Sequence, residues 1–199
     1  MEISLFDDIS EGLQENLSHE RYFHTLGVAY TACALAMRYK YEPAERAFIA
    51  GLLHDCAKYK DMDKLFSECD DSLYILSEFD QKNPALIHSK LGPIVAQEKY
   101  GIFDWEIQDA IRNHTTGAPD MGILSKIVFV ADYIEPNRDG LLPHITKIQE
   151  TAYQDLDLAV LMILENTLQH LAESGKEIDP MTQKTYDFYK DLIDKRKED

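Results

Sequence analysis

The sequence predicts an all-α protein, with a single domain over residues 1–199, and three observations support this prediction. Apolar residues recur every three or four positions along nearly the whole chain, which is the spacing of one face of a helix. The chain has no sustained alternation of apolar and polar residues, the pattern of a half-buried strand. Typical helix start and stop residues stand at the ends of the periodic segments.

Most of the expected helices have a recognisable beginning or end. Ser18 and Asp104 are suited to cap the helices that follow them, Pro43 suits the first turn of a helix, and Gly101 suits a helix end. Two prolines and a glycine predict a loop over 135–143. The expected helices, in chain order, span residues 2–16, 19–40, 43–55, 61–69, 72–79, 84–100, 104–113, 122–135, 144–153, 155–174 and 180–197.

The charge balance excludes one class of partner. The chain has 20 Lys and Arg residues against 36 Asp and Glu residues, for a net charge of −16, whereas a protein that binds a nucleic-acid polymer through phosphates needs a basic surface. Residues 21–149 hold 14 of the bases and 18 of the acids, so most of the excess acid lies towards the two ends. The charge therefore argues against long nucleic acids but not against a small anionic nucleotide.

Cysteine usage and hydropathy bear on the compartment. Three cysteines without Cys-x-x-Cys spacing, Cys33, Cys56 and Cys69, suggest neither a disulfide framework nor a thiolate zinc site, and we expect each to be a small core residue. No stretch approaches the roughly 20 apolar residues of a membrane-spanning helix, and the N-terminus is acidic, unlike a secretory signal. We therefore expect a cytoplasmic protein with no membrane partner. The sequence does not determine the oligomeric state, and a homodimer is possible.

An ionisable pair ends one of the most apolar segments. His54 and Asp55 follow the run 47–53 directly, and buried charges are costly unless they are paired or bound to a metal. Neighbouring residues on a helix point about 100° apart, so this pair can bracket one site. The carboxylate can bridge two cations, whereas the imidazole can bind only one.

Four further residues extend this ligand set. His24 lies in line with Val28 on an inward helix face, and Asp132 ends the apolar run 127–131. His88 and His114 lie within and at the end of helical segments. Any one of these residues alone is more often a hydrogen-bonded core residue or a cap, but six together favour a metal site. The other histidines, His19, His144 and His170, lie in polar surroundings and are expected at the surface.

The donor set and its neighbours indicate the chemistry. Imidazole nitrogens with carboxylate oxygens suit iron, manganese, cobalt, nickel or zinc, and suit calcium or magnesium poorly. Three cations, Arg21, Lys58 and Arg138, stand close to the candidate ligands in the sequence. A metal centre flanked by arginine and lysine is suited to a phosphate ester.

The order His24, His54-Asp55, Asp132 resembles the pattern of the HD-domain phosphohydrolases, an all-helical bundle fold. Five longer words in order resemble the bacterial YqeK family of HD-domain symmetrical bis(5′-nucleosyl)-tetraphosphatases. These words are Arg-Tyr-Phe-His-Thr-Leu-Gly-Val-Ala (21–29), Gly-Leu-Leu-His-Asp-Cys-Ala-Lys (51–58), Ile-His-Ser (87–89), Asn-His-Thr-Thr-Gly (113–117) and Ala-Asp-Tyr-Ile-Glu-Pro-Asn-Arg (131–138). The resemblance implies a motif core over 18–140 with additional C-terminal helices.

The resemblance also implies roles for individual residues. Two divalent metal ions are expected, with iron as the first choice and manganese, cobalt, nickel or zinc as alternatives. One metal would take His24, His54, Asp55 and Asp132, and the second would share Asp55 and take His88 and His114. Catalytic roles are implied for Asp55, Lys58 and Arg21, and substrate-binding roles for Arg21, Lys58, Thr115, Thr116, Tyr133, Glu135 and Arg138. The aromatic residues near the motifs, Tyr22, Phe23, Tyr59 and Tyr133, are candidates to stack on an adenine, although core packing is the favoured role for Phe23.

The activity implied is symmetrical cleavage of diadenosine tetraphosphate into two ADP molecules, with a metal-bridging hydroxide attacking beside the central oxygen. Two alternatives stay open. The first is an HD-domain phosphohydrolase of another nucleotide, such as a nucleoside monophosphate, a deoxynucleoside triphosphate or a guanosine polyphosphate. The second is a non-catalytic module that binds metal and senses a nucleotide.

Overall fold

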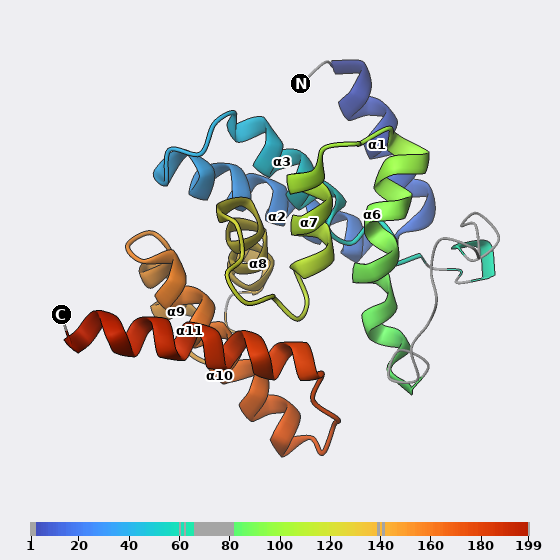
Figure 1. The fold of residues 1–199 in the computed structure, drawn as a ribbon. Coiled ribbons are helices and arrows are strands. Elements are labelled where there is room, and N and C mark those ends of the chain that lie inside the picture. The colour runs from blue at the N-terminus through green and yellow to red at the C-terminus, as the bar shows by residue number, and fades with distance from the viewer. Residues whose placement is uncertain are drawn as a thin grey trace.

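A computed structural model describes residues 3–59, 61, 63–65, 82–138, 140 and 142–198, and within these ranges the chain contains helices and no strand (Figure 1). The all-α prediction is confirmed. Of the expected short pieces, 72–79 lies outside the described residues, and only 61 and 63–65 of 61–69 are described. The α-helices are α1 (Ile3–Asn16), α2 (His19–Arg38), α3 (Ala44–Leu53), α6 (Ile87–Tyr100), α7 (Trp105–Asn113), α8 (Ile123–Ile134), α9 (Ile145–Ala152), α10 (Leu156–Glu173) and α11 (Pro180–Glu198).

The expected caps lie at the helix ends. The Ser18 side chain accepts a hydrogen bond from the Arg21 amide at the start of α2, and Asp104 caps α7 in the same way. Gly101 adopts the left-handed conformation after α6, with φ of 65°. The expected loop over 135–143 contains one ordered 3₁₀ turn, η3 (Pro136–Arg138), since proline is compatible with the first turn of a helix.

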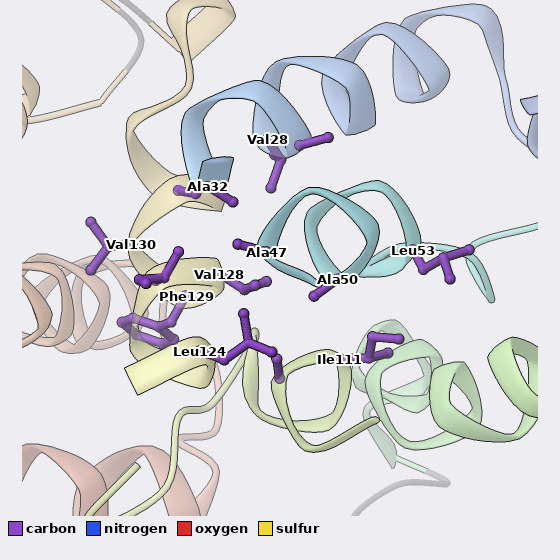
Figure 2. Close-up of a cluster of buried hydrophobic side chains, with 14 of the residues drawn as sticks. Val28, Ala32, Ala47, Ala50, Leu53, Ile111, Leu124, Val128, Phe129 and Val130 are labelled. Carbon is purple, nitrogen blue, oxygen red and sulfur yellow. The ribbon is translucent and has the colours of Figure 1, made fainter. Parts of the chain in front are cut away.

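The core lies where α2, α3, α7 and α8 meet, and Figure 2 shows side chains of all four helices in one buried cluster. Helices α2 and α3 approach closely because Gly51 lacks a side chain: a Cβ there would lie 2.9 Å from the Ala29 Cα. The close approach brings the His24 and His54 rings to a centroid distance of 5.2 Å. The labelled members of the cluster are Val28, Ala32, Ala47, Ala50, Leu53, Ile111, Leu124, Val128, Phe129 and Val130.

The C-terminal helices α9, α10 and α11 form a group on one side of α8 (Figure 1). Asp157 at the start of α10 connects them to the core, because its carboxylate accepts a hydrogen bond from Lys126 of α8 at 2.8 Å and another from Arg196 of α11. These helices also enclose apolar side chains such as Ile163 and Tyr189. None of the helices in the described part of the chain is long and apolar enough to cross a membrane.

Several single-residue expectations are resolved by burial. Cys56 is buried and Cys33 is half-buried, whereas Cys69 lies outside the described residues. His19, His144 and His170 are exposed as predicted. Phe23 is 50 % exposed, so its expected place in the core is wrong. It precedes His24 by one position and therefore points about 100° away from the inward face of α2.

Candidate metal centre

The six candidate ligands come together from five helices. His24 lies on α2, His54 and Asp55 end α3, and the others come from α6, from the end of α7 and from α8. All are buried except Asp132, whose side chain is 23 % exposed. Segments distant in the sequence thus supply a compact group of imidazoles and carboxylates. Two overlapping sets of its atoms could hold a metal ion: His24 with His54 and Asp132, and His54 with Asp55 and His114.

Each imidazole is oriented through its Nδ1 atom. The Nδ1 atoms of His54, His88 and His114 each lie 2.7 Å from the backbone carbonyl oxygen three residues earlier. A carbonyl oxygen can only accept, so each Nδ1 carries the proton. Nδ1 of His24 lies 2.9 Å from Oε1 of Glu135, to which it donates in the same way. In the neutral ring this leaves the Nε2 lone pair for a metal, the arrangement typical of metal-binding histidines.

The Nε2 atoms face one another and the two carboxylates. His88 Nε2 lies 3.1 Å from His114 Nε2, and these atoms lie 3.2 and 3.4 Å from Asp55 Oδ1. Two neutral rings that both carry their proton on Nδ1 would direct lone pairs at each other across this distance. A cation between them removes the repulsion, so the geometry of this pair suits a metal ion.

Asp55 stands between two halves of the cluster. Its Oδ1 faces His88 and His114, whereas its Oδ2 lies 3.5 Å from His54 Nε2. On that second side, Asp132 Oδ1 lies 2.9 Å from His24 Nε2 and 3.8 Å from His54 Nε2. One carboxylate therefore presents a different oxygen to each group of imidazoles.

Unsatisfied buried atoms provide a separate test of whether a metal fits. Among the described residues, His24 Nε2, His54 Nε2 and Asp55 Oδ1 are buried without a hydrogen-bond partner. Buried polar atoms without partners are rare and costly in native proteins. Coordination of a cation would satisfy all three, because each is an electron-pair donor.

The ionisation states are those that metal binding requires. Burial lowers the pKa of His88 to about 4, although Asp55 opposes the shift. Burial by itself would raise the pKa of Asp55, but its contacts with His54, His114 and His88 hold it well below its usual value. The pKa of Asp132 is lowered against its burial in the same way, chiefly by His24. The carboxylates are thus ionised and His88 is neutral at pH 7.

The three predicted cations lie at the edge of the cluster, and each is roughly one-third exposed. Arg21 Nη1 lies 2.9 Å and Lys58 Nζ lies 3.6 Å from Asp55 Oδ2, and Arg138 Nη2 lies 3.0 Å from Asp132 Oδ1. Their partial exposure leaves them accessible to an anion that approaches the cluster.

The residues expected beside the substrate lie in different parts of the structure. Thr115 Oγ1 lies 3.1 Å from His114 Nε2 and 3.4 Å from His88 Nε2, inside the cluster. The Thr116 hydroxyl donates to the Gly117 carbonyl within its own loop. Tyr133 accepts a hydrogen bond from Asn166 of α10 and lines a cavity of about 430 Å³ with residues of α10.

Glu135 lies beneath the cluster, and its side chain is 1 % exposed. Its Oε1 faces His24, and its Oε2 accepts hydrogen bonds from the backbone and side-chain nitrogens of Asn137 at 2.8 and 2.9 Å. Gly27 leaves room for it, because a Cβ at this position would lie 2.4 Å from Glu135 Oε2. The contacts of Glu135 orient His24, a role that the sequence analysis missed.

An open cavity of about 560 Å³ adjoins the His24 side of the cluster. Its lining includes Arg21, His24, Arg138 and the exposed ring of Phe23. The ring of His19 packs against Phe23 with centroids 4.6 Å apart. The sequence analysis named Phe23 as a stacking candidate but favoured the core for it, because an aromatic residue on an apolar helix is usually buried.

Comparison with known proteins agrees with this geometry. The HD domain family model matches residues 21–137. The chain belongs to the HD-domain family. The match begins at Arg21 and ends one residue before Arg138, and it encloses all six candidate ligands.

Relatives that match most of the chain indicate a group within the HD-domain family. The chain is 35 % identical over 179 residues to a symmetrical bis(5′-nucleosyl)-tetraphosphatase of Bacillus subtilis, and the match covers 88 % of this chain and 92 % of the relative. A Halalkalibacterium halodurans protein of the same name is 37 % identical, with 87 and 91 % covered. The predicted resemblance to this family is confirmed.

A solved structure supports the fold as well. A crystal structure described as a predicted HD superfamily hydrolase involved in NAD metabolism, from Clostridium acetobutylicum, superposes on the HD-domain chain with a TM-score of 0.87. The two sequences are 37 % identical, and the match covers 94 % of this chain and 97 % of the other. The C-terminal helices α9–α11 therefore belong to the shared architecture.

Proposed function

We propose that this protein hydrolyses diadenosine tetraphosphate symmetrically, so that one water and one dinucleotide give two ADP molecules. The names of the relatives support the substrate, and the position of Asp55 carries the argument from this chain. A carboxylate whose two oxygens face two separate groups of imidazoles is suited to bridge two cations. Two-metal sites of this kind are common in enzymes that cleave phosphate esters and anhydrides.

The two cations have distinct ligand sets in this proposal. The first set consists of His24, His54, Asp55 and Asp132, and the second of His88, His114 and Asp55. Iron is the first choice because of the resemblance to the tetraphosphatase family, and manganese, cobalt, nickel and zinc also suit nitrogen and oxygen donors. When bound, the ions supply an activated water and neutralise charge on the phosphoryl oxygens.

The cations of the chain bind and orient the tetraphosphate. Arg21 and Arg138 hold phosphate oxygens on the His24 side, since guanidinium groups bind phosphate through paired hydrogen bonds. Lys58 or Arg21 neutralises the charge on the departing ADP. The Thr115 hydroxyl donates to a phosphate oxygen near His88 and His114. No side chain is assigned as a general acid.

The cavity on the His24 side accepts one ADP half of the substrate in this scheme. Arg21 and Arg138 line it and would hold the phosphates, and the exposed Phe23 ring offers a face on which an adenine can stack. Glu135 acts through His24 and does not touch the nucleotide, because its oxygens are already bonded to His24 and Asn137.

Product analysis in isotopic water tests this function. Purified protein of measured metal content, loaded with iron(II) or manganese(II), is incubated with diadenosine tetraphosphate in ¹⁸O-enriched water. We expect ADP as the only product, with ¹⁸O in one of every two ADP molecules. AMP with ATP would contradict symmetrical cleavage. Absence of turnover by the fully metal-loaded protein would contradict catalysis and favour a nucleotide-sensing module.

The alternative nucleotides provide the specificity test. Under the same conditions we expect AMP, a deoxynucleoside triphosphate and a guanosine polyphosphate to be cleaved with a lower kcat/KM than diadenosine tetraphosphate. A higher kcat/KM for any of these would replace the proposed substrate while leaving the two-metal assignment in place.

A further inference from the structure

A second cavity lies where α6, the loop after α7 and the start of α11 meet. Its volume is about 440 Å³, within the range of small-molecule sites, roughly 300 to 1,000 Å³. Its lining combines apolar, polar and basic residues: Leu86, Ser89, Lys90, Arg112, Asn113, Thr116, Gly117, Ala118, Asp179, Pro180, Met181 and Lys184.

Three residues of this cavity are chain neighbours of the second ligand set. Ser89 follows His88, and Asn113 precedes His114 in the chain. Thr116 of the lining follows Thr115, whose hydroxyl contacts both of these imidazoles. The first cavity is lined by His24 itself, whereas the described residues that line the second include neighbours of His88, His114 and Thr115 and none of the six candidate ligands.

The charge of the lining is opposite to that of the whole chain. Among the described residues, the lining includes three basic side chains, Lys90, Arg112 and Lys184, and one acidic side chain, Asp179, in a protein with a net charge of −16. Basic groups concentrated in a cavity raise the local concentration of an anion. Met181, which is 40 % exposed, adds an apolar surface of the kind that packs on a nucleobase.

Helix α11 supplies one wall of the cavity and is held firmly in place. The loop after α7 packs against it so closely that a Cβ at Gly117 would lie 2.7 Å from Thr185 Cγ2, and Figure 1 shows this loop reaching towards the first half of α11. Gly117 has a φ of 64°, a left-handed backbone conformation that favours glycine at this position. Helix α11 therefore lines this cavity in addition to covering the core.

We propose that this second cavity is the binding site for the other nucleoside diphosphate half of the substrate. The proposal rests on the proposed function, because symmetrical cleavage places the central anhydride at the metal cluster and directs one nucleoside to each side. Lys90, Arg112 and Lys184 hold the phosphates, and Met181 contacts the base. Asp179 accepts hydrogen bonds from the ribose hydroxyls.

The first test counts product molecules on the holoenzyme. Equilibrium dialysis of labelled ADP against the manganese-loaded protein is expected to give two ADP bound per chain. One ADP per chain at saturation would overturn the second site. If the protein binds ADP but the wild type fails to hydrolyse diadenosine tetraphosphate, the proposed function fails instead.

The second test separates the two nucleosides of the substrate. Lys184→Glu removes a phosphate contact and should raise KM for both diadenosine tetraphosphate and adenosine 5′-tetraphosphate. Met181→Ala removes a base contact, and we expect it to raise the ratio of the first KM to the second by about tenfold, or about 1.4 kcal/mol. The physical reason is that a substrate with one nucleoside can place it in the cavity beside His24. Both residues are exposed, so the fold tolerates these changes.

Lys190→Glu is the matched control, because Lys190 is exposed on the same helix and does not line the cavity. It makes the same charge change as Lys184→Glu and is expected to leave both KM values at the wild-type level. An equal rise of KM in this control, or an unchanged KM ratio in Met181→Ala, would overturn the proposal.

Discussion

Asp55 and Asp157 are two poorly exposed carboxylates in one chain, with side-chain exposures of 2 and 13 %, and both have a lowered pKa despite their burial. Around Asp157 the lowering comes from Lys126 and Arg196, which hydrogen-bond to its oxygens. Around Asp55 it comes mainly from imidazoles, which are neutral or weakly basic groups. The same shift thus has two different origins.

The difference separates a structural carboxylate from a ligand. Asp157 ties α8, α10 and α11 together through permanent charges and has its hydrogen bonds satisfied. Asp55 keeps a buried oxygen without a partner among the described residues, despite contacts with Arg21 and Lys58. A buried polar atom of this kind is costly unless a cation completes its coordination.

Removal of Asp55 is expected to have the largest effect. Asp55→Ala should abolish binding of both metals and lower kcat/KM for diadenosine tetraphosphate by more than about 10³-fold, because both ligand sets lose the shared carboxylate. Metal analysis after gel filtration, with single-substrate kinetics, measures both quantities. Asp157→Ala is the matched control and should keep two metals per chain. Retention of either metal by Asp55→Ala would contradict the bridging role.

Substitution of Glu135 tests whether the orientation of the His24 ring contributes to metal affinity. Glu135→Ala should weaken metal binding at the His24 side by about 10–100-fold, since the Nδ1 hydrogen bond fixes the ring, and should leave the site formed by His88 and His114 loaded. Titration calorimetry with manganese measures the two sites. Glu135→Gln, which keeps an oxygen acceptor, should restore most of the affinity. Equal losses in both variants would show that the charge, and not the orientation, decides.

Asp157 is expected to affect stability and not chemistry. Asp157→Asn should lower the free energy of unfolding by about 1–2 kcal/mol, because two charged partners lose an anion at a partly buried position. Thermal unfolding of the metal-loaded protein measures the change, and metal content and kcat should match the wild type. Loss of metal in this variant would remove the distinction between the two carboxylates.

The smallest expected effect is the pH dependence of the stability that the Asp157 carboxylate contributes. The pKa of Asp157 is lower in the folded state than in the unfolded chain, so its stabilisation is present above the unfolded value of about 3.9 and is lost as the pH falls through the folded value. The difference in melting temperature between wild type and Asp157→Asn should therefore be constant above about pH 5 and shrink in more acidic solution. A difference that grows on acidification would contradict the sign of the shift.

Local patterns in the sequence sufficed for the helices and for the identity of the candidate ligands. Capping by Ser18 and Asp104 depends on neighbours two or three residues away, so these helix ends are readable from the chain. The six ligand candidates end or face apolar segments, and burial of such groups is a strong signal even without coordinates. The five short motifs indicated the family for the same reason, because each is a run of neighbouring residues in the sequence.

The environment of each side chain required the tertiary structure. Glu135 and His24 are 111 positions apart, and nothing local indicates that one orients the other. Phe23 was expected inside because its type is apolar, but the inward face of α2 is used by His24 and Val28, which turns Phe23 outwards. Tyr133 was expected beside the substrate, and the contact with Asn166 shows it against α10.

Periodicity, caps and ligand-bearing motifs are local properties, so the all-helical fold, the family and the types of candidate metal ligand followed from the sequence alone. The tertiary structure was needed to show which atom of each ligand faces the centre, that Asp55 turns its two oxygens to different imidazoles, and that α11 lines a second cavity together with residues next to His88 and His114. These features depend on the packing of helices far apart in the chain, and packing is set by all the contacts at once.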